Sequence, residues 1–98
     1  MELQIIQTKI FNIRGQMVML DFDLAELYEV ETKRMKEAVR RNMERFPSDF
    51  MFELTREEYK SLRTQFATLE TGRGKFSKYL PFAFTEHGLV MLLRVIYV

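Results

Sequence analysis

The chain concentrates its cationic side chains in one short stretch. Residues 33–45 hold six cations and two acids, a local charge of +4, whereas the net charge of the whole chain is +1. Lysine and arginine neutralise phosphates, arginine also binds the edge of guanine, and asparagine binds the edge of adenine. The candidate DNA contacts here are Thr32, Lys33, Arg34, Lys36, Arg40, Arg41 and Asn42, and Arg45 is the sixth cation. We expect the cations of this helix to point into solvent and to bind DNA.

A helix-turn-helix would position these side chains. Leu24 and the small Ala25 share the inner face of a first helix within residues 21–31, and Met35 lies on the inner face of a second helix over residues 32–45, by 3.6-residue periodicity. In this motif the second helix enters the DNA major groove. The alternative, a basic helix face that is only solvated, stays open from these residues alone.

The sequence also predicts how the two helices begin and where the turn lies. Asp21, or Asp23 two residues later, is expected to cap the first helix, and Thr32 the second. Residues 29–31 form the turn. Its first residue often takes a positive φ, which a non-glycine residue such as Glu29 adopts at a cost of about 1 kcal/mol or more.

Short strands flank this motif and predict a mixed fold. Residues 9–20 alternate in the manner of a β-hairpin, with Arg14-Gly15 as its turn. Further strands are expected at residues 50–54 and 79–84, the latter at a sheet edge because it contains Pro81. The predicted fold class is α+β, one domain over residues 1–98 that is either complete or the N-terminal part of a longer protein.

Two more helices are predicted from their first residues. Residues 55–58 match the capping box of a helix start, and Thr85 is placed to cap a last helix that begins at Glu86. The buried stripe of the earlier helix would be Tyr59, Leu62 and Phe66. Residues 89–98 are apolar except for Arg94, too few to span a bilayer, so this end is either buried or a subunit contact such as a homodimer interface.

A second basic cluster lies between these helices, in a polar segment at residues 67–78. Arg73, Lys75 and Lys78 follow or flank two glycines there. We interpret the segment as an exposed loop whose cations form a wing that contacts DNA, and the alternative is again a solvated loop. It is not a phosphate-binding loop, because the Gly-Lys-Ser/Thr and the helix start of that motif are missing.

The residue types do not support an enzyme. There is no cysteine, and the single histidine, His87, has no nucleophile in a recognisable motif, so we expect it to pack or cap. One histidine and scattered carboxylates do not form a metal site, and no cofactor motif is present. The N-terminus lacks the pattern of a signal peptide, and a cytoplasmic protein without membrane contact is expected.

Taken together, these motifs resemble a known family. The similarity covers about residues 9–93 and follows the order of that family's motifs. The matching runs are IRGQMVMLDFDLAELYEVETKRMKEAVRRNMERFPSDFMFELTREEY and YLPFAFTEHGLVML. On these runs the chain resembles the ORF-six N-terminal branch of the KilA-N superfamily, whose domains occur in phage and bacterial proteins of antirepressor or regulatory type.

The resemblance implies an α+β domain that binds double-stranded DNA, with residues 32–42 as the recognition helix, within a phage or prophage transcription regulator. It also implies that a C-terminal domain often follows. Glu29 stands where relatives usually carry glycine, and the tail RVIYV departs from the usual continuation. The competing hypothesis is a protein-interaction module, which binds a repressor or another protein through the basic face or the apolar last helix.

Overall fold

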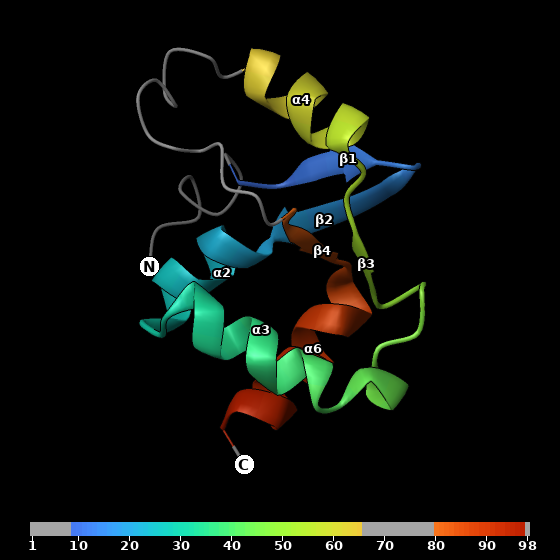
Figure 1. The fold of residues 1–98 in the computed structure, drawn as a ribbon. Helices are drawn as coiled ribbons and strands as arrows, with labels where there is room; N and C mark the ends of the chain where they lie inside the picture. The colour runs from blue at the N-terminus through green and yellow to red at the C-terminus, as the bar shows by residue number, and fades with distance from the viewer. Residues whose placement is uncertain (1–8, 66–79, 98) are drawn as a thin grey trace.

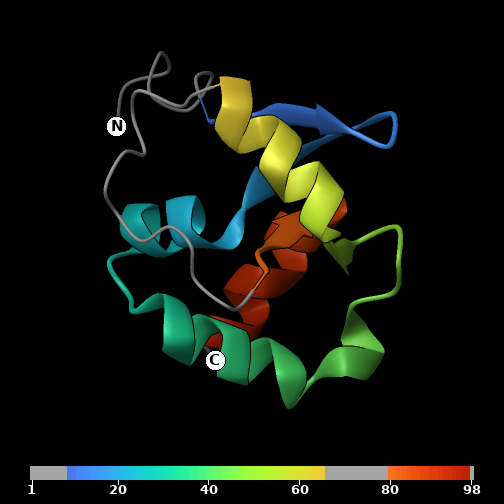
Figure 2. The same ribbon diagram turned by 45° about the horizontal axis from the view of Figure 1, so that its top comes forward.

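The computed structural model describes residues 9–65 and 80–97. Its centre is a four-stranded antiparallel sheet in the order β1-β2-β4-β3. Of the described helices, one covers one face of this sheet and three cover the other (Figures 1 and 2). The strands are β1 (Phe11–Ile13), β2 (Gln16–Leu20), β3 (Met51–Glu53) and β4 (Phe82–Phe84). The predicted α+β class is confirmed.

The two faces of the sheet follow from strand alternation. In β4, Phe82 and Phe84 belong to the core on the three-helix side, whereas Ala83 between them belongs to the core on the other side. Likewise Met19 of β2 faces the three helices and its neighbour Leu20 faces away. Successive side chains of a strand point to opposite faces, and both faces of the sheet are covered, so β4 and the last three residues of β2 are buried and apolar.

The hairpin between β1 and β2 closes at the expected pair of residues. Arg14 and Gly15 have φ of 57° and 77°, and Ile13 pairs with Gln16 across the turn. Two positive φ angles in a row are typical of the type I′ turn, whose twist matches that of the strands. The predicted hairpin and its turn are confirmed.

The three-helix layer consists of α2 (Asp21–Tyr28), α3 (Thr32–Arg40) and α6 (Glu86–Ile96), and a short 3₁₀ helix, η1 (Met43–Arg45), follows α3. Apolar residues from all three α-helices share one core with the inner face of the sheet. The predicted single helix over residues 32–45 is therefore wrong at its C-terminal end, because the backbone leaves the α conformation after Arg41 and tightens into η1.

Helix α4 (Arg56–Gln65) covers the opposite face of the sheet, and its start confirms the predicted capping box. The Thr55 hydroxyl accepts a hydrogen bond from the Glu58 N–H at 3.1 Å, and the Glu58 carboxylate accepts one from the Thr55 N–H at 2.8 Å. Tyr59 and Leu62 pack against the sheet as expected, and Phe66 lies outside the described residues.

The start of α6 confirms the role of Thr85 and shows why glycine follows it. The Thr85 hydroxyl accepts from the Gly88 N–H at 3.3 Å and donates to the Asp49 carbonyl at 2.8 Å. A Cβ on Gly88 would collide with the carbonyl oxygen of Phe50. Gly88 is therefore needed for the close approach of α6 to the segment that leads into β3.

Three other local predictions are wrong. The N-cap position of α2 is Leu20, without a side-chain cap, so neither Asp21 nor Asp23 has that role, and Glu31 rather than Thr32 precedes α3. The predicted edge strand near Pro81 is internal, since β4 pairs with both β2 and β3. Pro81 is compatible with this because it lies before the first paired residue.

Candidate nucleic-acid interface

The turn between α2 and α3 places the two helices at an angle to each other (Figure 1). Glu29 is in the left-handed region, with φ 58° and ψ 44°, as the sequence predicts. Its N–H donates to the carbonyl of Glu26 at 3.2 Å, and the Val30 N–H donates to that of Ala25 at 2.9 Å. This pattern is the Schellman motif, which ends a helix and reverses the chain. The glutamate therefore adopts the backbone geometry that glycine adopts most easily.

The packing of α2 against α3 depends on small and apolar side chains. Leu24 and Ala25 of α2 are buried in the same core as Met35 and Val39 of α3. Ala25 is only 2% exposed, and its small side chain permits a close crossing of the helices. The predicted helix-turn-helix packing is confirmed.

The exposed face of α3 carries most of the predicted cations. Lys33, Arg34, Arg40 and Arg41 are exposed, and Arg45 is exposed on η1. The two acids among them, Glu37 and Glu44, are exposed too, so five cations and two acids leave a surface charge of +3. Residues at this spacing share one side of the helix with Glu37 among them, so the cations outnumber the acid there and the face is cationic.

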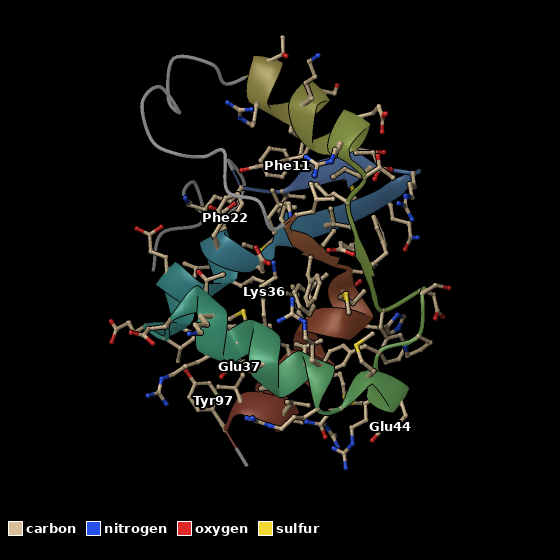
Figure 3. The ribbon with its side chains drawn as sticks, in the orientation of Figure 1. Phe11, Phe22, Lys36, Glu37, Glu44 and Tyr97 are labelled. Atoms are coloured by element: carbon tan, nitrogen blue, oxygen red, sulfur yellow. The ribbon has the colours of Figure 1, made fainter. Side chains whose placement is uncertain are left out.

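Lys36 is not part of this face, so the expectation that it points into solvent is wrong. Its ammonium lies 3.4 Å from an Asp21 carboxylate oxygen, donates to the Leu80 carbonyl at 2.8 Å and stands 4.7 Å from the centre of the Phe82 ring. Figure 3 shows Lys36 directed from α3 toward the interior of the domain. A buried, paired ammonium is not available to a phosphate, and we leave Lys36 out of the interface.

Asp21 is the acceptor that holds Lys36 in the interior. One oxygen of its carboxylate faces Lys36 and also accepts the Phe82 N–H at 3.0 Å. Burial raises the pKa of Asp21, and the hydrogen bond from Phe82 and the charge of Lys36 oppose this rise. The pair thus joins the start of α2, the middle of α3 and the start of β4. No local sequence signal indicates it, because the partners are far apart along the chain.

The remaining candidates of this stretch differ in their surroundings. The Asn42 amide donates to the Ala38 carbonyl at 2.8 Å, just after the C-terminus of α3. One of the two donors that it could offer to adenine is therefore already used. The Arg34 guanidinium lies 3.3 Å from the exposed Glu31 carboxylate, an ion pair that solvent screens strongly. Thr32 is half-buried at the first position of the helix.

A shallow hollow of about 320 Å³ lies beside the C-terminal end of α3. The Arg40 guanidinium borders it, 5.6 Å from the centre of the Phe82 ring. Its other lining residues are Met43, Met51, Phe52 and Glu53. The ring orients Arg40 at the edge of the cationic face.

The other predicted functional residues fall into two groups. Arg73, Lys75 and Lys78 lie outside the described residues. His87 stacks on the Phe50 ring, with 5.7 Å between ring centres, which agrees with a packing role. Among residues 9–65 and 80–97 no cluster of three metal-ligating side chains is present, and no described helix is long and apolar enough to cross a membrane.

Comparison with known proteins gives one family match. The model of the ORF6N domain family matches residues 8–95, which is nearly the whole chain. This domain is related to KilA-N, occurs in antirepressor-like proteins of phages and prophages, and is not an enzymatic family. No significant match was found among the curated proteins or among the solved structures.

Proposed function

We propose that this chain, which belongs to the ORF6N domain family, binds double-stranded DNA through the exposed face of α3 and regulates transcription. The observation that carries the proposal is the position of the cations. Lys33, Arg34 and Arg40 are exposed on the second helix of a helix-turn-helix, the element that enters the major groove in such motifs, and Arg41 is exposed directly after it.

The electrostatics of this face favour a polyanionic ligand. The whole chain is nearly neutral, but the field at a surface depends on nearby charges, and α3 with η1 presents five cations. Each phosphate that these cations neutralise releases counterions, so binding should weaken steeply with added salt. The arginines also supply the two-pronged donors that recognise guanine. We therefore assign both phosphate contacts and base recognition to the same helix face.

Fluorescence anisotropy on labelled duplex DNA, measured over a salt series, tests the proposal. The variant Lys33→Ala/Arg41→Ala removes two exposed cations, one from the first turn of α3 and one directly after its last residue. The control Arg56→Ala/Lys60→Ala removes two exposed cations from α4 in the opposite layer. We expect the first variant to lose affinity and the slope of log affinity against log salt to fall by roughly 0.9 for each lost phosphate contact. The second should bind as the wild type does.

The outcomes distinguish DNA binding by the cationic face from a face that is only solvated. Equal affinity of both variants, or a wild-type affinity that does not change with salt, would contradict DNA binding by α3. Selection of bound duplexes from a random pool then tests specificity, since purely electrostatic binding would enrich no sequence.

A further inference from the structure

Helix α6 exposes a stripe of apolar side chains on the side that faces away from the core. Val90 and Leu93 are 55% and 40% exposed, whereas Leu92 on the inner side is fully buried. Tyr97, directly after the last residue of α6, is 59% exposed, although its hydroxyl donates to the Tyr28 carbonyl at 3.0 Å and its ring packs edge-on against that of Tyr28. The three exposed residues recur at intervals of three and four, so they share one helix face. Exposed apolar side chains that gather on one element mark an interaction surface more often than scattered ones do.

Two opposite charges flank this stripe symmetrically. Glu86 stands four residues before Val90, and Arg94 stands four residues after it. Both side chains are exposed, and neither pairs with another described residue of its own chain. Residues at a spacing of four lie on the same side of a helix, so the acid, the valine and the cation form one row.

We propose that a second copy of this chain covers the stripe, with the two α6 helices antiparallel and crossing at Val90. In that arrangement Val90 meets itself on the two-fold axis, and Glu86 of each copy faces Arg94 of the other. A two-fold interface requires such a self-complementary patch, in which residue i meets j and j meets i. Glu86 and Arg94 lie at equal sequence distances from Val90 and carry opposite charges, so they meet this requirement.

The size of the stripe sets the strength of the association. One face of an eleven-residue helix is smaller than the roughly 800 Å² per partner of a standard stable interface. The dimer is therefore weak in isolation. It uses none of the cations of α3, so it adds to the proposed DNA binding and does not compete for the same side chains. Dimers of helix-turn-helix domains bind paired half-sites, and DNA would thus favour the association.

Sedimentation equilibrium of the whole chain without DNA tests the dimer independently of its proposed function. The wild type is compared with Glu86→Arg, Arg94→Glu and the double exchange Glu86→Arg/Arg94→Glu, over micromolar to millimolar concentrations. Each single reversal places like charges opposite each other twice, and we expect it to weaken dimerisation by roughly tenfold or more. The double exchange restores the opposite charges and should recover most of the association. Glu57→Arg, at an exposed position of α4, changes the net charge by the same amount and sign as Glu86→Arg and serves as its control.

The same set of variants also defines the results that would overturn the proposed dimer. A wild type that stays monomeric up to millimolar concentration would overturn the proposal. Association that the single reversals leave unchanged, or that the double exchange does not recover, excludes the antiparallel pairing of Glu86 with Arg94. Circular dichroism establishes that each variant is folded, and Val90→Glu gives a second route, because it places two carboxylates together on the axis.

Discussion

Two of the ion pairs among the described residues, Asp21–Lys36 in the three-helix layer and Arg14–Glu58 on the opposite side of the sheet, join distant parts of the domain and differ in burial and geometry. Lys36 and Asp21 lie in the three-helix layer with side chains only 9% and 2% exposed. Arg14 and Glu58 join the hairpin turn to α4, with side chains 43% and 25% exposed. Both charged groups of the buried pair are shielded from water, whereas the groups of the exposed pair keep much of their hydration.

The difference shows what each pair contributes. The buried pair is completed by backbone groups, the Leu80 carbonyl and the Phe82 N–H, and it sets the position of α3 against the sheet. The exposed pair has the better geometry, with two hydrogen bonds of 2.7 and 3.0 Å between guanidinium and carboxylate, and Arg14 also lies over the Phe52 ring. Good geometry at the surface nonetheless contributes little, because solvent screens the charges.

The largest effect is expected from breaking the buried pair on one side only. Lys36→Met keeps the apolar stem but leaves the Asp21 carboxylate buried without its counter-charge. This should lower the free energy of unfolding by roughly 3–5 kcal/mol. Urea denaturation followed by circular dichroism measures it. The control is Lys33→Met on the exposed face of the same helix, which should stay within about 0.5 kcal/mol of the wild type. Equal losses for both variants would contradict the burial of Lys36.

An intermediate effect is expected when both charges of the buried pair are removed. In Asp21→Asn/Lys36→Met the amide oxygen at position 21 can still accept the Phe82 N–H, and no charge is left unpaired. The double variant should therefore be more stable than Lys36→Met alone, with a coupling of about 0.5–3 kcal/mol in the double-mutant cycle. If the two losses simply added, the contact between the side chains would not be energetically coupled.

The smallest effect is expected at the exposed pair, where the dependence on pH is informative. The guanidinium of Arg14 lowers the pKa of Glu58 below its usual value of 4.5. A lowered pKa in the folded state adds stability above the unfolded value, and this stability is lost as the pH falls through the folded value. Glu58→Gln should thus be slightly less stable than the wild type at pH 7, and the gap should close in acid.

The contribution of Asp21 to the free energy of unfolding is expected to change with pH in the direction opposite to that of Glu58. Burial raises its pKa, so its share of stability is lost as the pH rises through the folded value and is regained below it. Thermal denaturation from pH 7 down to pH 3 checks both signs. A gap between Glu58→Gln and the wild type that widens in acid would contradict the lowered pKa of Glu58.

Features set by neighbouring residues were predictable from the sequence. The hairpin turn at Arg14-Gly15, the caps at Thr55 and Thr85 and the positive φ of Glu29 each depend on a few consecutive residues, because turns and caps bind their own backbone. The inner stripe of α3 was also predictable, since helical periodicity needs no knowledge of the partner.

Features set by contacts between distant segments were not predictable. The helical position of Lys36 lies beside the buried stripe of Met35 and Val39, at the boundary between core and solvent, and periodicity does not decide on which side such a residue ends. The sequence likewise did not show that β4 is an internal strand, because strand order depends on partners far away in the chain.

The sequence by itself thus determined the local elements and the cationic composition of one helix, since hydrogen bonds and periodicity act over a few residues. Only the tertiary structure decided which of these cations reach solvent. Asp21 and the Leu80 carbonyl, brought to α3 by the sheet, stabilise a buried ammonium that a helix alone would leave hydrated. The same packing leaves Val90 and Leu93 of the last helix exposed to solvent.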